Sequence, residues 1–255
     1  MIFVPDSRAF ETETLSMRSS RRRLLRRVAS IGALIGGTAS GIVGHQAFSQ
    51  VVRTLTEVPI PTPTAHGSMP LEEAMSRRKS VRDYSAESIN ISQLSQILWA
   101  AQGITHDGLR SAPSAGALYP LEIYVVAKDG GVTGLQCGIY HYKPANHRLS
   151  LTKAGDYSQE LQSASLDQEP IGLAAATIVI IAVFERTTAK YAKRVIQYVF
   201  QESGHVAQNI YLQATALNLG SVVMGAFDDD AVRRVIGAGI KERPVYIQPI
   251  GVPGA

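Results

Sequence analysis

The longest helical pattern in the sequence, from residue 190 to residue 220, constrains the fold more than any other feature. Apolar side chains recur there at helical spacing, with alanines between them: Tyr191, Val195, Val199, Val206, Ile210 and Leu217. A helix over most of this stretch would be about 40 Å long, and Gly220 is a suitable stop because glycine adopts the left-handed conformation freely. Since the pattern is apolar on more than one side, we expect this helix to be buried in a core or in a subunit interface.

The other patterns predict an α+β fold. Residues 221–226 read as a short buried strand that ends at Gly225, where a ligand can approach the backbone. Further strands are expected at 121–127, 138–142, 148–151, 174–184 and 245–250, and helices at 71–78, 94–101, 156–165 and 228–236. The run 174–184 is almost wholly apolar, which is typical of a central strand covered on both faces. We expect a mostly antiparallel central sheet packed between helices.

Charge and cysteine content exclude several classes of function. Seven of the 25 basic residues and three of the 21 acidic residues precede Gln50, so the net charge of +4 belongs to the N-terminal tail. The body is balanced, which argues against a nucleic-acid surface. Cys137 is the only cysteine, so an intrachain disulfide, a cysteine-based zinc site and an iron–sulfur cluster all lack ligands.

The first 49 residues resemble an export signal. Arg21 and Arg22 are followed by two leucines and by an apolar run at residues 28–44, a pattern typical of twin-arginine signals. The segment 47–49 is a candidate cleavage site. The alternatives are a membrane anchor, with membrane contact through residues 28–44, and a disordered basic tail. Residues 50–70 are rich in proline and read as a linker, which leaves 71–255 as the folded domain.

Two segments of the body are candidate ligand sites. The first contains Arg78, Lys79, Ser80 and Arg82, and its cations and hydroxyl could bind phosphate, although a solvated basic turn explains the charges equally well. The second, at 113–119, consists of small residues between two prolines and leads into the strand at 121–127. Such a loop lets backbone amides approach a flat ligand closely, or it is simply a tight connection.

Several motifs, in this order along the chain, resemble the nitroreductase-like flavoprotein superfamily and, more closely, its SagB-type (thiazoline/oxazoline) dehydrogenase branch. The similarity covers roughly Leu71 to Pro253. The segments that carry it are 78–84, 113–120, 138–142, 190–191, 204–209 and 223–227.

This resemblance implies an FMN-dependent oxidoreductase whose subunits form a homodimer through the long helix, with FMN at the interface. It implies that Arg78, Lys79, Ser80 and Arg82 hold the FMN phosphate. Pro113, Ser114 and Ala115 would approach the flavin from the partner subunit, and Gly225 and Ala226 would contact the ring. Lys190 and Tyr191 match the pair that azoline-oxidising members use as acid/base groups. Without the resemblance, Lys190 would read as a solvated lysine.

Two departures from the family pattern affect the predicted site. Ala117 stands where many nitroreductases have asparagine, so one flavin hydrogen bond is expected to be missing. Many members also have basic phosphate ligands in a C-terminal extension, so here Arg78 and Arg82 are expected to carry more of the phosphate charge.

The expected reaction is hydride transfer between an organic substrate, such as an azoline-type peptide, and FMN. The alternatives are an NAD(P)H-dependent reductase of nitro compounds or quinones and a non-catalytic, membrane-tethered flavin-binding module. An export signal predicts that the protein is periplasmic or membrane-associated, and NAD(P)H is scarce in the periplasm. Without export the protein would be cytoplasmic.

Overall fold

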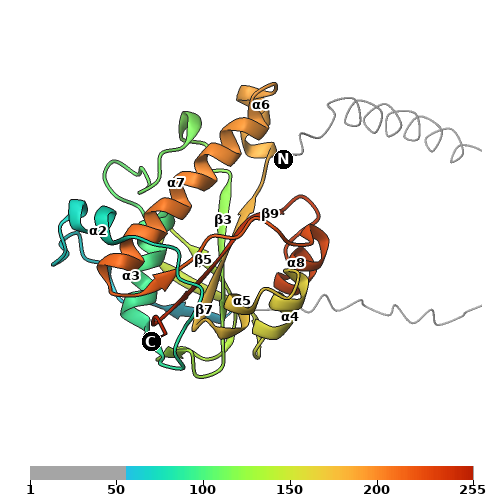
Figure 1. The fold of residues 1–255 in the computed structure, drawn as a ribbon. Helices are drawn as coiled ribbons and strands as arrows, with labels where there is room; N and C mark the ends of the chain where they lie inside the picture. Colours follow the sequence, from blue (N-terminus) through green and yellow to red (C-terminus); the bar gives the residue numbers. More distant parts are fainter. Residues whose placement is uncertain (1–55, 255) are drawn as a thin grey trace, which may run out of the picture. The chain divides into compact units, whose positions relative to one another are not determined.

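A seven-stranded antiparallel sheet forms the centre of the domain (Figure 1). The computed structural model describes residues 56–254. The strands, in their order across the sheet, are β1 (Thr56–Pro59), β6 (Arg148–Ala154), β5 (Gly138–Lys143), β3 (Leu121–Ala127), β7 (Ala176–Ala182), β9 (Arg243–Gly251) and β8 (Gly220–Ser221). A separate parallel pair joins β2 (Ile89–Asn90) to β4 (Val132–Thr133). The predicted antiparallel sheet is confirmed.

Helices cover both faces of the sheet. One face carries α2 (Leu71–Arg77), α3 (Ile91–Gln102) and α7 (Val195–Ala216), and the other carries α4 (Ser158–Ala164), α5 (Glu169–Leu173) and α8 (Asp229–Ile236) (Figure 1). Side chains of the central strands alternate between two hydrophobic clusters, as strand geometry requires. Val125 and Ile180 pack in the cluster with α3 and α7, whereas Val126 and Ile181 pack in the cluster with α4 and α8. The α+β arrangement is therefore as expected.

Local signals in the sequence explain where two of these helices begin. The Asn90 side chain accepts a hydrogen bond from the Gln93 backbone N–H, and the Gln93 side chain accepts one from the Asn90 N–H, so α3 starts with a capping box. Asp228 caps α8 through the Ala231 N–H, with acidic residues in the first turn.

The long helix is interrupted, which the sequence did not predict. Residues 192–194 form a turn that separates α6 (Glu185–Tyr191) from α7, so α7 has 22 residues and is about 33 Å long. Lys190 and Tyr191 consequently lie on α6. The apolar spacing from Tyr191 to Val195 fits both a continuous helix and a turn, and neither glycine nor proline marks the break. The helix also ends earlier than expected. α7 stops at Ala216, and the residue that adopts the left-handed conformation is Asn218 (φ 56°) rather than Gly220.

The folded domain begins before residue 71. Thr56–Pro59, which we expected to be linker, forms edge strand β1 and pairs with Leu149 and its neighbours on β6. Proline lacks a backbone N–H and is tolerated in strands at a sheet edge, so a proline-rich sequence does not rule out a strand here.

The predicted signal, its 28–44 run and residues 50–55 of the linker lie outside the described residues. Among residues 56–254, no helix has the length and apolar character needed to cross a membrane.

Candidate functional site

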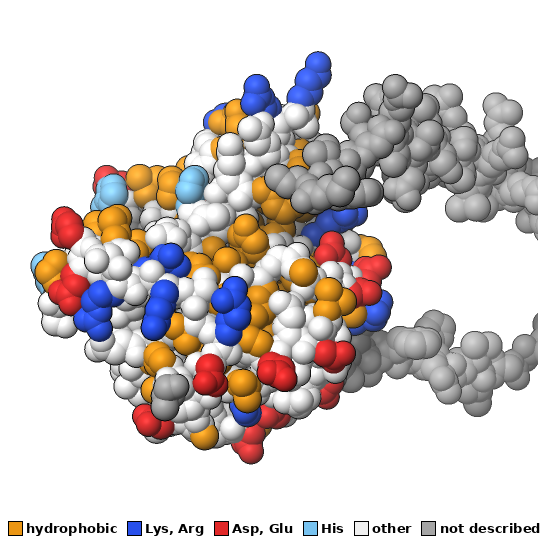
Figure 2. Space-filling view, viewed as in Figure 1, with side chains coloured by type: hydrophobic (Ala, Val, Ile, Leu, Met, Phe, Trp, Pro, Cys, Tyr) orange, Lys and Arg blue, Asp and Glu red, His pale blue; other side chains and the backbone are white. Residues whose placement is uncertain are grey.

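The cationic segment follows α2 and is fixed against the end of the sheet. The Val81 N–H donates to the Ser221 carbonyl at 2.9 Å, and Gly220 lies so close that a Cβ there would be 2.6 Å from Val81 Cγ1. Lys79, Ser80 and Arg82 are exposed, and Arg78 is half-buried. Figure 2 shows Lys and Arg side chains spaced across the face that carries α2 and the lower end of α7.

None of these cations has a carboxylate partner in the part of the chain that the structure describes. Arg78, Lys79 and Arg82 therefore present positive charge that the described domain does not neutralise. An anion with several oxygens, such as a phosphate, is the kind of ligand that such a group binds. The guanidinium of Arg78 lies 5.1 Å above the ring of Tyr211, which orients this side chain.

Tyr211, which the sequence analysis missed, connects this segment to the one at 223–226. Its hydroxyl accepts a hydrogen bond from the Val223 N–H at 2.7 Å and lies 3.1 Å from Ser80 Oγ. Because that hydroxyl can donate its own proton to Ser80, the Ser80 proton remains available for an anion. The only sequence signal is a tyrosine on the buried face of α7.

The predicted ring contacts, Gly225 and Ala226, are both exposed. Their segment is held by two hydrogen bonds between Met224 and Ile247. A Cβ at Gly225 would meet only the Tyr246 ring, at an ordinary 3.6 Å. The fold would therefore accept a side chain at this position, and glycine instead leaves open surface beside the backbone.

The small-residue loop lies directly against the Lys190–Tyr191 pair of the same chain. Gly116 has a left-handed φ of 63°, and a Cβ on it would be 2.7 Å from Lys190 Nζ and 2.9 Å from the Tyr191 hydroxyl oxygen. The Lys190 ammonium lies 5.4 Å from the Tyr191 ring centroid, and that ring packs edge-on against Tyr198 at 5.1 Å. Lys190 is exposed and Tyr191 half-buried in the single chain.

Ser114 fastens the same loop to α7. Its Oγ donates to Glu202 Oε2 at 2.6 Å and accepts from the Tyr119 N–H at 2.9 Å. Glu202 is 3% exposed, and its Oε1 has no hydrogen-bond partner among the described residues. Burial raises the pKa of Glu202 to about 7, although the Ser114 hydrogen bond and the Arg110 charge favour the ionised form.

A charged network holds α6 in place beside this loop. Arg186 of α6 donates to the Tyr119 carbonyl at 3.0 Å and pairs with Glu122 of β3. His141 Nε2 lies 2.7 Å from the other Glu122 oxygen. Burial opposes ionisation of Glu122, but the hydrogen bonds from His141 and Arg186 prevail and lower its pKa to about 2. This network positions the helix that carries Lys190, and no local motif announced it.

Within one chain the predicted site residues form two separate groups. Ser80 contacts α7 at Tyr211, whereas Ser114 contacts it at Glu202. Nine helical residues correspond to about 13 Å along the axis. The first group comprises 78–82 and 223–226, and the second comprises 113–117 and 190–191. Pro113 is exposed and Ala115 half-buried.

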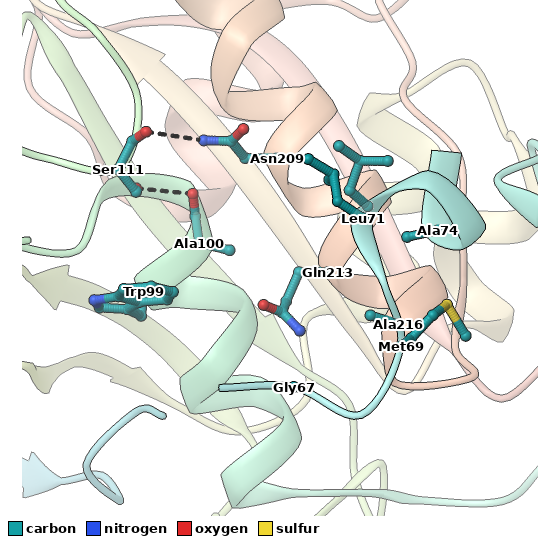
Figure 3. A pocket seen from close by; sticks show the side chains of 11 residues that line it. Gly67, Met69, Leu71, Ala74, Trp99, Ala100, Ser111, Asn209, Gln213 and Ala216 are labelled. Carbon is teal, nitrogen blue, oxygen red and sulfur yellow. Dashed lines mark hydrogen bonds between the residues drawn. The ribbon is translucent and has the colours of Figure 1, made fainter. Parts of the chain in front are cut away.

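A surface pocket of about 300 Å³ lies elsewhere, between the segment 67–69, α2, α3 and α7 (Figure 3). Asn209 and Ser111 meet at its rim, where the Asn209 amide donates to the Ser111 carbonyl at 3.3 Å. Trp99 lines this pocket and is only partly buried. None of the predicted site residues lines the pocket.

Comparison with known proteins identifies relatives of this domain. The nitroreductase family model matches residues 75–252. A Methanocaldococcus jannaschii protein with the provisional name of nitroreductase is 43% identical over 182 residues, which cover 71% of this chain and 90% of that protein. The microcin B17-processing protein McbC of Escherichia coli is 28% identical over 56% of this chain. The trifolitoxin-processing protein TfxB of Rhizobium leguminosarum is 35% identical over 45% of it. The matches span 54% of McbC and 32% of TfxB.

Solved structures agree with these matches. A provisionally named nitroreductase of Ralstonia eutropha superposes with a TM-score of 0.69 at 26% identity, over 88% of this chain and 97% of that one. A chain of the E. coli microcin synthetase McbBCD complex superposes with a TM-score of 0.65 at 20% identity, over 96% and 94%, and shares the fold. The resemblance found in the sequence is confirmed for the nitroreductase family, and the matches to McbC and TfxB support its SagB-type branch. The chain therefore belongs to the nitroreductase family of oxidoreductases.

Proposed function

We propose that this protein is an FMN-dependent dehydrogenase of the SagB type, which passes hydride from an organic substrate to FMN. The observation that carries the proposal is the placement of Lys190 and Tyr191 against the loop at Gly116. An amine and a phenol beside a loop of small residues can exchange protons with a substrate seated over that loop. A peptide that contains an azoline ring is the substrate class that McbC and TfxB suggest, because both are named for processing peptide toxins.

The described residues fit the phosphate of FMN. Arg78, Lys79 and Arg82 offer positive charge that no described carboxylate neutralises, and Ser80 has a proton to donate. Arginine binds phosphate oxygens in planar, bidentate pairs, and such charge-assisted bonds are about twice as strong as neutral ones. Among the described residues, Arg78 and Arg82 would therefore make the strongest contacts with the phosphate, with Lys79 beside them.

The fit of the ring depends on a homodimer, which we also propose. The outer side of α7 presents Ile196 and Phe200, each about half exposed (51% and 50%), and a Cβ on Gly204 of the same helix would meet nothing within 4 Å. An exposed apolar stripe beside a glycine is a suitable contact for a second copy of α7. Such a dimer would bring the 113–117 loop of one subunit toward Gly225 and Ala226 of the other.

The chemistry divides between cofactor and protein. Bound FMN supplies the two-electron acceptor for hydride. Lys190, as the free amine, would take the proton that leaves the substrate, and Tyr191 would donate a hydrogen bond to the reacting group. Lys190 is exposed in the single chain, so substrate or a second subunit must exclude water around it.

The second candidate is an NAD(P)H-dependent reductase of nitro compounds or quinones, which the name of the M. jannaschii relative favours. A third reading, a non-catalytic flavin-binding module, is supported by the exposure of Lys190. On location, Arg21, Arg22 and the run at 28–44 support export to the periplasm or attachment to a membrane. A protein found in the cytosol and rapidly reduced by NADPH would favour the reductase instead.

The experiment compares the full chain with Lys190→Ala, loaded with FMN and mixed anaerobically with azoline peptides or NADPH. The matched control is Lys193→Ala, since Lys193 is also exposed but lies in the turn after α6. We expect substrate to bleach the flavin in wild type and in the control, and much more slowly in Lys190→Ala with FMN still bound. Equal bleaching in all three proteins would remove Lys190 from the mechanism. Bleaching by NADPH alone would establish the reductase.

A further inference from the structure

Glu202 is a buried acidic group for which the proposed reaction has no use. It lies in the middle of α7, is 3% exposed, and has one oxygen without a partner among the described residues. Its other oxygen accepts the only proton of the Ser114 hydroxyl, at 2.6 Å. Ser114 belongs to the loop whose Gly116 touches Lys190 and Tyr191. A buried carboxyl is thus one hydrogen bond away from the candidate site.

The hydrogen bonds of Ser114 allow two arrangements. With Glu202 ionised, the carboxylate can only accept, so the Ser114 proton points inward and its Oγ accepts from the Tyr119 N–H. With Glu202 protonated, the carboxyl O–H can donate to Ser114 Oγ. That oxygen then accepts two hydrogen bonds, and its own proton must turn away from Glu202.

We propose that Glu202 is a positioning residue that sets the direction of the Ser114 hydroxyl. Ser114 then donates to a ligand on the outer side of the loop only while Glu202 carries a proton. The ligand atom would be a hydrogen-bond acceptor on the flavin ring, such as a carbonyl oxygen, so the inference rests on the proposed function. Flavin binding would accordingly strengthen proton binding by the Glu202 carboxyl, and protonation of Glu202 would strengthen flavin binding by the same factor.

The surroundings of Glu202 suit a group that changes its protonation near neutral pH. Burial raises its pKa to about 7, whereas Ser114, the Arg110 guanidinium and Gln102 of α3 favour the ionised form. The Gln102 amide oxygen accepts a hydrogen bond from Arg110 at 2.9 Å, and its Nε2 has no hydrogen-bond partner among the described residues. The positive charge of Arg110 also interacts with the charges of Glu122 on β3 and Arg186 on α6, and with Tyr119. A single cation shared in this way offsets burial only in part.

The test measures the affinity of the full chain for riboflavin, which lacks the titrating phosphate of FMN, by fluorescence across about two pH units on either side of 7. Wild type should bind about fivefold tighter on the acid side, the effect of one neutral hydrogen bond. Glu202→Gln, whose amide can donate to Ser114, should keep the tighter affinity throughout. Ser114→Ala should keep the weaker affinity throughout. Glu160→Gln, which removes an exposed charge on α4, should retain the wild-type step.

A readout without flavin tests the same idea. Carbon-13 NMR of glutamate-labelled protein should show one carboxyl that titrates near 7 and is missing from Glu202→Gln. A Glu202 carboxyl that titrates as an ordinary glutamate, a step that persists in Glu202→Gln, or a flat wild-type profile would overturn the inference while flavin binding stands. Failure of every variant to bind FMN at every pH would overturn the proposed function, and the inference with it.

Discussion

Gly116→Ala is the substitution that most directly tests the contact between the loop and the Lys190–Tyr191 pair. The added methyl group would lie 2.7 Å from Lys190 Nζ and 2.9 Å from the Tyr191 hydroxyl. Ordinary contacts to carbon are about 3.5–4.0 Å, so the ammonium must retreat by roughly 1 Å. A displacement of that size can cost about 100-fold in rate when it affects a reacting group. We therefore expect about a 100-fold loss of substrate-driven flavin reduction.

Backbone strain must be separated from this displacement, and Gly130→Ala is the matched control. Gly130 has nearly the same φ (65° against 63°), but a Cβ there would meet nothing within 4 Å. Both variants should lose about 1–2 kcal/mol of stability, the cost of a side chain in the left-handed region. In a domain of this size each kcal/mol lowers Tm by about 2–4 °C. Stopped-flow reduction rates that are equal in the two variants would refute the role given to Gly116 and its two neighbours.

Three other substitutions follow from the hydrogen bonds and from the pKa of Glu202. Glu202→Gln should flatten the pH dependence of stability, which urea unfolding at several pH values measures. The folded-state pKa of Glu202, about 7, lies above the ordinary 4.5, so wild type loses at most about 3 kcal/mol of stability as pH rises between these values. Tyr211→Phe should cost about 1 kcal/mol because the half-buried Val223 N–H loses its acceptor, and should weaken FMN binding; thermal unfolding and FMN titration check both, and an unchanged Tm would contradict the first. Asn90→Ala should destabilise α3 by about 1 kcal/mol in thermal unfolding without changing FMN affinity.

Sequence patterns predicted the elements whose signals are local. The apolar run at 174–184, the acidic start at Asp228 and the helix ending before Gly103 each appear where expected. The turn at 192–194 escaped because an apolar spacing of four residues fits both a helix and a turn. Edge strand β1 escaped because Pro59 and the prolines that follow it at 61 and 63 resemble a linker, and only its pairing with β6 reveals it.

The sequence supplied candidate site residues but not the contacts between them. The motifs named the residues of the cationic segment and of the Lys190–Tyr191 pair. Nothing local links Tyr211 to Ser80, which lie 131 residues apart in the sequence. Likewise, Glu202 reads as a polar residue on a helix until the fold buries it beneath Ser114. Long-range contacts of this kind depend on how helices pack on the sheet, and sequence periodicity carries no such information.

The most direct measurement for the central claim is the flavin content of the purified full-length protein. We expect a yellow protein, or a colourless one that takes up added FMN at one per subunit, with affinity strongly reduced in Arg78→Ala. Riboflavin, which lacks the phosphate, should bind wild type and Arg78→Ala about equally. A protein that stays colourless and ignores added FMN, or one whose FMN affinity is the same with and without Arg78, would contradict it.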